Sequence, residues 1–187
     1  MNETLKVIAE RSSIRAYTDE RLTEEEIRAL VTAGLQAPTA RNEREIHFTV
    51  LDGKNPLLEE IDKERKLSML TGIEDAEARA KIESNPNNFY YSAPTVVILS
   101  VNKDFYWSKL DAGIAVENMS LAAQSMGLGS LIIGIIDKAM RGEKSEYFAN
   151  ALKFPENYEF AIAFAAGHKN TEKAPHEIDF DKDVSFI

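Results

Sequence analysis

Arginine and serine side chains gather near the start of the sequence, in the stretch RSSIR at residues 11–15. Arginine supplies planar, charge-assisted pairs of donors, and serine hydroxyls add neutral donors beside them. Two guanidinium groups four residues apart can therefore meet one phosphate from several sides. The same cluster is also typical of a solvated helix end, where the arginines would pair with Glu10, Asp19 or Glu20.

Three further stretches hold polar groups or bare backbone that a flat ligand could use. Asn42, in the segment PTARNER, offers a donor and an acceptor, as recognition of a heteroaromatic ring edge requires; asparagine is also common in turns. Gly134 lies in an apolar run, where a glycine often marks the close approach of a ligand or another backbone. The C-terminal tail carries Lys169, Lys173 and His176, and each could supply a further cation.

Other kinds of site find little support in the sequence. His47, His168 and His176 lack the paired spacing that suits a metal ion, so we expect no metal site. The pattern GxSxG, which marks a nucleophile elbow, is absent. The patterns GxGxxG and GxxxxGK[ST], which mark phosphate-binding loops, are absent too. The chain has no cysteine, which excludes disulfides, thiol catalysis and cysteine-ligated iron–sulfur clusters.

Length and charge narrow the class of protein. The 187 residues suffice for one domain with a sizeable core, and we expect a single domain over residues 1–187. Acidic residues outnumber basic ones by 31 to 22, and the resulting net charge of −9 argues against a general nucleic-acid binder. The apolar runs are shorter than the roughly 20 residues of a membrane span, and the first residues lack a signal peptide's apolar core. We expect a cytoplasmic protein that binds neither nucleic acid nor membranes.

A long helix near the middle of the chain is the element that should position these residues. From Trp107 onward it is apolar or small on nearly every side, as expected of a helix buried on more than one face. Gly127 suits the left-handed residue that ends such a helix. A strand over residues 130–136 should follow, with Gly134 inside it. Further strands are predicted over residues 46–50, 93–101 and 158–166.

The remaining helices are recognised mainly by their caps. Asn2, Thr23 and Asn55 are predicted to begin helices, and a fourth helix is predicted from Asp137 to about Leu152. Residues 66–88 alternate charged helical stretches with the segment SNPNN, and we expect a mobile flap there. Strands and helices do not alternate regularly, which favours an α+β layer fold over a doubly wound sheet.

Several of these stretches resemble the nitroreductase family of FMN enzymes. RSSIRAY is similar to the family's R-R-S-I-R-x-F opening, APTARN to its A-P-S-x-x-N segment, and FYYSAPTVVIL to its aromatic-x-x-A-P strand. DAGIAVENMSLAAQSMGLGS resembles the family's D-x-G-x-A-x-x-N-x-x-L-x-A-x-x-x-G-L-G helix and hinge. These matches occur in the family's order and cover nearly the whole chain. After Asn42, however, members usually read x-Gln-Pro-Trp, and this chain reads Glu43-Arg44-Glu45-Ile46.

The resemblance implies a fold, an assembly and a reaction. The fold would be α+β, with a central, mostly antiparallel sheet flanked by helices, and the protein a homodimer built around the long central helix. FMN would lie at the dimer interface. NADH or NADPH would pass a hydride to flavin N5, and a nitroaromatic, quinone or similar planar acceptor would then be reduced in a ping-pong mechanism. No side-chain acid or base is implied, so no catalytic residue is assigned.

The resemblance also implies, motif by motif, which residues contact FMN. The phosphate and ribityl chain would be bound by Arg11, Ser12, Ser13 and Arg15, with Lys173 or His176 closing the phosphate site. The flavin of the partner subunit would be reached by Pro38, Thr39 and Asn42, and the isoalloxazine would lie along Ile133 and Gly134. Two alternatives stay open. One is a flavin-binding carrier or sensor without NAD(P)H turnover, and the other is a specialised relative, such as a reductive dehalogenase or a flavin-cleaving enzyme.

Overall fold

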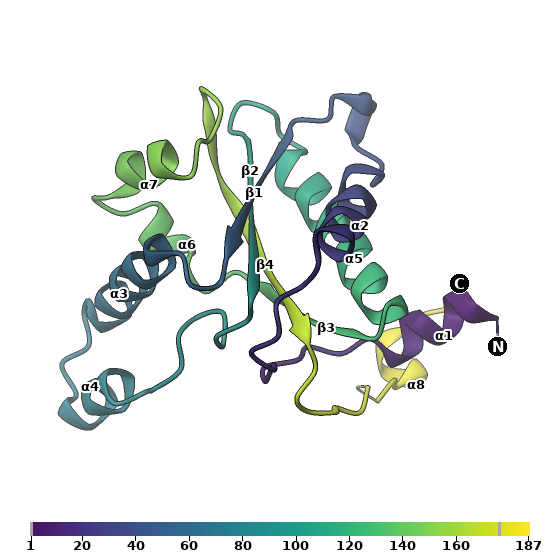
Figure 1. Cartoon of the computed structure of the whole chain (residues 1–187), viewed down its shortest axis with the longest axis horizontal. Helices are drawn as coiled ribbons and strands as arrows, with labels where there is room; N and C mark the ends of the chain where they lie inside the picture. The colour runs from purple at the N-terminus through teal and green to yellow at the C-terminus, as the bar shows by residue number, and fades with distance from the viewer. Residues whose placement is uncertain (1, 176) are drawn as a thin grey trace.

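Four strands form one antiparallel sheet in a computed structural model, which describes residues 2–175 and 177–187. The strands lie in the order β1 (Ile46–Asp52), β2 (Thr95–Asn102), β4 (Tyr158–His168) and β3 (Leu128–Ile133). Each pairs antiparallel with its neighbour, and helices lie against both faces of the sheet (Figure 1). The predicted α+β fold with a central antiparallel sheet is confirmed.

Two layers of helices enclose the sheet. On one side lie α2 (Glu24–Leu35) and α5 (Ser108–Ser125), and on the other α3 (Pro56–Leu70), α6 (Asp137–Met140) and α7 (Ser145–Ala151) (Figure 1). Successive strand residues face opposite sides of a sheet. Val97 and Leu99 of β2 therefore join the core beneath α5, whereas Val96 and Ile98 join the core on the other side. This is why β2 is apolar throughout, as predicted.

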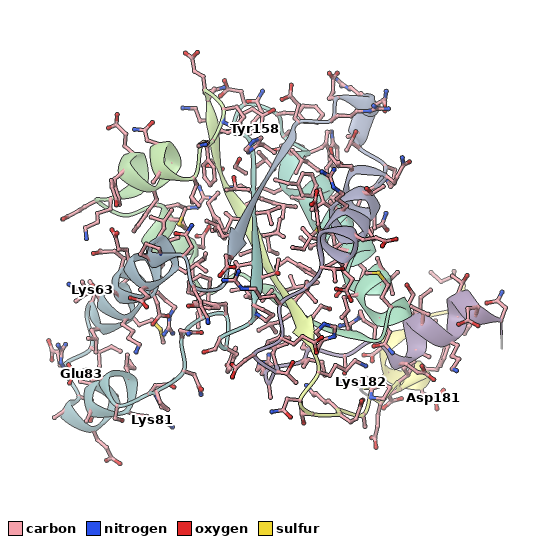
Figure 2. All side chains as sticks on the ribbon, viewed as in Figure 1. Lys63, Lys81, Glu83, Tyr158, Asp181 and Lys182 are labelled. Carbon is pink, nitrogen blue, oxygen red and sulfur yellow. The ribbon has the colours of Figure 1, made fainter. Side chains whose placement is uncertain are left out.

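The shorter elements lie at the edges of this arrangement. Helix α1 (Glu3–Glu10) and helix α8 (Phe180–Asp183) lie near the C-terminal end of α5, and the 3-10 helix η1 (Ala40–Asn42) lies near its other end (Figure 1). Helix α4 (Ala76–Glu83) continues beyond α3, and Lys63, Lys81 and Glu83 project outward there (Figure 2). The predicted flap thus consists of the end of α3 and all of α4; its mobility stays a prediction. Among the described residues, no helix has the length and apolar character that crossing a membrane requires.

The predicted helix starts are confirmed by their capping hydrogen bonds. The Asn2 and Asn55 side chains accept hydrogen bonds from the backbone N–H groups of Leu5 (2.9 Å) and Leu57 (3.0 Å). Thr23 and Glu26 form a reciprocal capping box. Such caps satisfy amide groups that the first turn of a helix leaves without partners. The starting points of α1, α2 and α3 are therefore encoded locally.

The strand predicted over residues 130–136 is wrong at both ends. Strand β3 begins at Leu128 and ends at Ile133, which pairs with Ala163 of β4. Gly134 therefore lies beyond the strand, not inside it. Its carbonyl oxygen accepts a hydrogen bond from the Asp137 amide (3.0 Å), which turns the chain into α6.

The single helix predicted from Asp137 to about Leu152 is also wrong, because two helices occupy this stretch. Gly142 interrupts it, and glycine is a poor helix former. Its amide donates to the Ala139 carbonyl (3.3 Å), and its own carbonyl accepts from the Ser145 amide (3.0 Å). These turns separate α6 from α7. Gly127, in contrast, ends α5 with a φ of 74°, as predicted.

Candidate functional site

The arginine–serine segment near the N-terminus lies along the outer edge of β3. Ser13 pairs with Ser130 in a parallel bridge, and the Ile14 amide donates to the Ser130 carbonyl (2.9 Å). The Ile14 side chain is 3% exposed and anchors the segment in the core. Further on, Tyr17 pairs antiparallel with Lys169, directly after β4. Main-chain pairing therefore fixes residues 13–17 against the ends of two strands.

Close packing explains two glycines beneath this segment. A Cβ atom at Gly129 would lie 2.9 Å from Ile14 Cγ2, and one at Gly167 would lie 2.5 Å from Pro94 Cδ and 3.0 Å from Tyr17 Cδ1. The separations of 2.9 Å and 2.5 Å are too short for a Cβ atom without a shift of its neighbours. Burial raises the pKa of the Tyr17 hydroxyl well above its usual range, against the opposing effect of the Arg15 charge. The hydroxyl thus stays protonated and donates to the Ile14 carbonyl (2.8 Å).

Cationic groups gather where the segment meets the C-terminal half of α5. Arg11 Nε lies 3.4 Å from Glu117 Oε1, an arrangement that leaves the terminal guanidinium nitrogens available. The Ser12 hydroxyl donates to the Lys173 carbonyl (3.1 Å), so the backbone of Lys173 lies at this corner. His176 lies outside the described residues.

Lys169 is another cation of this corner. Sequence reasoning named it as a possible cation, and the family resemblance then pointed to Lys173 or His176 instead. Its Nζ atom lies 3.3 Å from Gln124 Oε1 of α5, and its side chain is only 16% exposed. Gln124 follows Glu117 by seven residues, about two helical turns, and so lies on the same face of α5. The sequence feature that could have identified Lys169 was its position. It directly follows β4, so its backbone stays close to the sheet.

Arg15 lies farther along the segment and faces an aromatic ring. Its Cζ atom is 5.8 Å from the centre of the Tyr91 ring, within the range of a cation–π contact. Tyr91 and Ser92 both have positive φ values, 52° and 56°, which is unusual for residues other than glycine. The motif FYYSAP thus supplies a wall beside Arg15.

The loop from Pro38 to Arg44 lies at the other end of α5. The Ala40 amide donates to both carboxylate oxygens of Asp111, each at 3.1 Å, and Asp111 is 3% exposed. Arg41, Asn42 and Arg44 have left-handed backbones, with φ values of 56°, 58° and 55°. Sequence reasoning missed the anchoring role of Asp111, although it is the first acidic residue of the central-helix motif.

Hydrogen bonds within this loop orient Asn42. The Thr39 hydroxyl oxygen accepts from the Arg44 amide (3.1 Å), and Arg44 Nε donates to Asn42 Oδ1 (3.2 Å). The amide oxygen of Asn42 is therefore engaged, and its NH₂ group can donate to another partner. Pro38 is exposed at the start of the loop.

Ile133 and Gly134 end β3 in different environments. The Ile133 side chain is 3% exposed and belongs to the core, so only its backbone can face a ligand. Gly134 is exposed, and a Cβ atom there would meet no atom of the described residues within 4 Å. The close approach that its glycine suggested is therefore not made by this chain's own described residues.

One chain does not bring all the predicted contacts together. Helix α1, which ends just before Arg11, and η1, which carries Asn42, lie toward opposite ends of α5 (Figure 1). Asp111, which holds the loop, precedes Gln124 by 13 residues, or about 20 Å of helix. The structure thus gathers Arg11, Ser12, Ser13 and Lys173 with the start of β3, and leaves Pro38, Thr39 and Asn42 apart from them.

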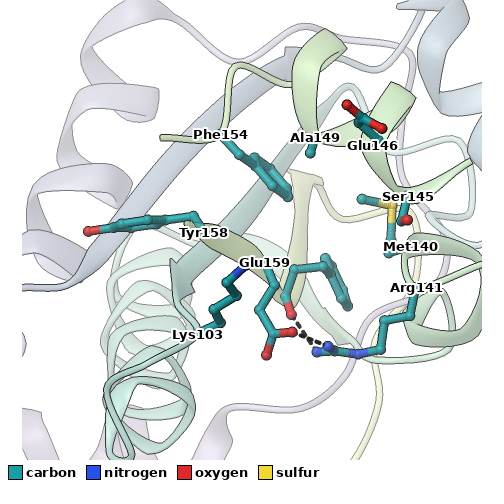
Figure 3. Close-up of a pocket in the computed structure, with 10 residues that line it drawn as sticks. Lys103, Met140, Arg141, Ser145, Glu146, Ala149, Phe154, Tyr158 and Glu159 are labelled. Carbon is teal, nitrogen blue, oxygen red and sulfur yellow. Dashed lines mark hydrogen bonds and ion pairs between the residues drawn. The ribbon is translucent and has the colours of Figure 1, made fainter. Parts of the chain in front are cut away.

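Another cavity lies away from these residues. It measures about 360 Å³ and is lined by Phe154, Tyr158, Phe160, Arg141 and other residues of β4, α6 and α7 (Figure 3). Glu159 and Asp137 pair with Arg141 there, so this guanidinium is already neutralised. None of the predicted FMN-binding residues lines this cavity.

The arginines fall into two groups. Those outside the predicted site are all paired with carboxylates, namely Arg21, Arg28, Arg65, Arg79 and Arg141. Among the described residues, no carboxylate forms an ion pair with Arg15, Arg41 or Arg44, although the chain is strongly acidic. Among the described residues, the arginines without a carboxylate partner therefore all lie in the two segments that sequence reasoning selected.

Residues 8–168 match the sequence model of the Nitroreductase family. This chain belongs to the nitroreductase family. The match covers both arginine-bearing segments, the central helix and all four strands, and it confirms the resemblance inferred from the motifs.

Relatives of this nitroreductase-family chain agree with that assignment. It is 30% identical to an Archaeoglobus fulgidus protein named as a candidate NADH dehydrogenase/NAD(P)H nitroreductase, over 96% of this chain and 92% of that one. It is also 30% identical to the FMN reductase (NADPH) of Bacillus subtilis strain 168, over 90% of this chain and 66% of that one. The crystal structure of a nitroreductase with bound FMN from Desulfitobacterium hafniense DCB-2 has a TM-score of 0.88 and 33% identity, over 100% of this chain and 99% of that one.

Proposed function

We propose that this nitroreductase-family protein is an FMN-dependent NAD(P)H oxidoreductase that reduces nitroaromatic, quinone or similar planar acceptors as a homodimer. The observation that carries the proposal is the edge of β3. Cations and hydroxyls gather at its beginning, around Arg11, and the accessible Gly134 follows its end. An elongated ligand with an anionic group at one end and a flat ring at the other suits such an edge.

The donors at the beginning of β3 fit a phosphate group. The terminal nitrogens of Arg11, the hydroxyls of Ser12 and Ser13, and the ammonium groups of Lys169 and Lys173 would bind it. Charge-assisted hydrogen bonds of this kind are among the stronger ones in proteins. His176 stays part of the proposal as a further phosphate contact. Arg15 would contact the ribityl chain, held in place by the Tyr91 ring.

The end of β3 would receive the isoalloxazine ring. The backbone of Ile133 and Gly134 would lie along it, since Gly134 has no Cβ atom and open space beside it. When bound, FMN would accept a hydride from NADH or NADPH and deliver it to the acceptor. The chain's own part is to bind the phosphate, orient the ring and place positive charge near it.

A second copy of the chain would complete the site. Pro38, Thr39 and Asn42 lie too far along α5 to reach the same chain's flavin, so we assign them to the flavin of the partner. Large apolar side chains on α1 and α5 support a subunit contact there, because Leu5, Ile8 and Leu110 are each at least half exposed in one chain. Large apolar side chains left exposed on helices of one layer often mark protein interfaces.

An anaerobic absorption spectrum of the purified protein, recorded before and after addition of NADH and then NADPH, tests the proposal. We expect a bound flavin whose visible absorbance is lost with at least one of the two donors. A bound flavin that neither donor reduces would indicate a carrier or sensor. Absence of flavin even after reconstitution with FMN would refute the proposal.

A further inference from the structure

A second cavity, which we call the Arg44 cavity, lies between the end of α2 and the first half of β1. It measures about 290 Å³ and is separate from the cavity of Figure 3. Its lining consists of Gly34, Leu35, Gln36, Ala37, Thr39, Arg44, Ile46 and Phe48. It therefore adjoins the loop that carries Asn42, on the same chain.

The walls of the Arg44 cavity are mostly apolar. Leu35 is 61% exposed, and Ile46 and Phe48 are half-buried. At Gly34 a Cβ atom would lie 2.8 Å from Phe48 Cε1, so the glycine allows the Phe48 ring to lie against α2. An aromatic ring would find dispersion contacts with Leu35, Ile46 and Phe48.

At the polar end of the cavity lies Arg44, with which no carboxylate forms an ion pair in the part of the chain that the structure describes. Two hydrogen bonds fix Arg44, one from its amide to the Thr39 hydroxyl and one from Nε to Asn42 Oδ1. Its terminal nitrogens are left for another acceptor. Because arginines outside the two site segments are paired with carboxylates, the unpaired Arg44 points to an anionic partner from outside the chain.

Two of the three departures from the family's x-Gln-Pro-Trp pattern line this cavity, and the third, Glu45, does not. Arg44 stands where members usually have glutamine, and Ile46 stands where they have tryptophan. The first change adds a positive charge to the wall. The second replaces a large ring by a smaller side chain and thus leaves room. Arg44 and Ile46 thus give this chain's cavity a positive charge and a smaller wall.

We propose that the Arg44 cavity selects electron acceptors that carry a carboxylate on an aromatic ring. The carboxylate would pair with the terminal nitrogens of Arg44, which suit bidentate binding. The ring would lie against Ile46, Phe48 and Leu35, and its far end would be directed past Asn42. This inference rests on the proposed function, since Asn42 is there assigned to the partner's flavin.

The reduction itself balances with the donor already proposed. For a nitro group, one NAD(P)H supplies two electrons as a hydride, and a proton comes from solvent. The nitro group becomes a nitroso group, and one oxygen leaves as water. The Arg44 cavity adds no reactant to this step and acts only on which acceptor binds.

Paired substrates test the inference on the FMN-loaded protein. We compare kcat/KM for 4-nitrobenzoate with that for its methyl ester, which has the same ring and nitro group without the charge. The wild type should prefer the acid, and Arg44→Gln should lower the acid-to-ester ratio by about 10- to 100-fold, as expected for one charge-assisted pair. Arg44→Lys should lower it less, because lysine keeps the charge but not the planar fork.

Two further variants distinguish binding in the Arg44 cavity from a general effect of positive charge near the loop. Ile46→Trp restores the family's side chain while keeping Arg44, and it should weaken binding of the acid and the ester together. Arg41→Gln removes a neighbouring unpaired charge that does not line the cavity, and the ratio should then stay within about twofold of wild type. A fall in Arg41→Gln equal to that in Arg44→Gln would overturn the inference.

A binding measurement gives a readout that does not depend on turnover. Calorimetric titration of the oxidised protein with 4-nitrobenzoate should show binding that Arg44→Gln weakens by a similar factor. If the wild type treats acid and ester alike while NAD(P)H still reduces both, the inference fails and the proposed function stands. If no acceptor is reduced, the function fails, and the titration alone decides the inference. If Arg44→Gln changed only the preference for NADPH over NADH, Arg44 would bind the phosphate of the donor, and the inference would be overturned.

Discussion

The two ends of α5 present cations in different ways. At the C-terminal end, Arg11 and Lys169 are supported by Glu117 and Gln124 of the helix, and main-chain pairing with β3 holds the segment around Arg11. At the N-terminal end, Arg44 belongs to a loop with left-handed backbone conformations, and a single buried carboxylate, Asp111, holds that loop. The cations at the C-terminal end of α5, which we call the fixed end, are thus held by pairing with the sheet, whereas Arg44 at the N-terminal end lies in a loop held by side-chain hydrogen bonds.

This difference suggests a division of labour. A group that is present in every turnover, such as a cofactor phosphate, is bound best by donors that are already fixed. Contacts to a variable acceptor can be carried by a loop, since loops accept sequence change with less effect on the core. The departures at Arg44 and Ile46 lie at the end of the loop and at the first residue of β1, whereas RSSIRAY beside β3 differs from R-R-S-I-R-x-F only at Ser12 and Tyr17.

The largest expected effect is at the fixed end. Replacing Arg11 and Arg15 together by alanine should weaken FMN binding by at least 100-fold, because hydrogen bonds to charged groups each contribute roughly 1.5–3 kcal/mol. Titration of the apoprotein, followed by quenching of FMN fluorescence, measures the affinity. Circular dichroism should show an unchanged fold, and a double variant that retains full FMN would refute the phosphate assignment.

The next largest effect is expected at Asp111, the residue that holds the loop. Asp111→Ala should lower the free energy of unfolding by about 2 kcal/mol, since the Ala40 amide loses its acceptor. Urea denaturation measures this change, and trypsin should cut faster after Arg41 and Arg44. Asp111→Asn keeps an acceptor and should have a smaller effect. If FMN phosphate binding weakened as much as in the double arginine variant, the two ends would not be independent.

Substitutions at two glycines, Gly129 in β3 and Gly134 directly after it, distinguish an effect on packing from an effect on ligand binding. Gly129→Ala should lower the free energy of unfolding by about 1–3 kcal/mol, because its Cβ atom would crowd Ile14. Gly134→Ala should change it by less than about 0.5 kcal/mol, since open space surrounds that position. FMN affinity should nevertheless fall in Gly134→Ala. Thermal unfolding of the apoproteins and FMN titration distinguish the two effects, and equal destabilisation would contradict this comparison.

The smallest expected effect is a pH dependence of stability that arises from Tyr158, close to the loop. Burial and a hydrogen bond to Glu45 raise the pKa of Tyr158 to about 12 from its ordinary value of 10.0. The unfolded chain then releases this proton first as pH rises, so stability should be lost between about pH 10 and 12. Because Tyr158 is only partly buried, we expect less than about 1 kcal/mol. Tyr158→Phe should remove this part of the alkaline loss, measured by urea denaturation against pH.

Much of the fold could be predicted from local sequence. The caps at Asn2, Thr23 and Asn55 specify helix starts because the capping groups lie within three residues of their partners. β2 was recognisable because it is buried on both faces. In contrast, the end of β3 depends on where β4 stops providing partners, and the sequence of β3 alone does not contain that information.

The candidate site shows the same division. By itself, the sequence determined which side chains are chemically suited to the site, from the arginines and serines of residues 11–15 to Asn42, and through its motifs the family. Only the tertiary structure decided that Lys169 joins Arg11 against α5, that Asp111 holds the loop, and that Arg44 and Ile46 share one cavity. The reason is that hydrogen bonds and cavities form between segments far apart in the chain. Residue types limit what such contacts can be, and packing decides which of them form.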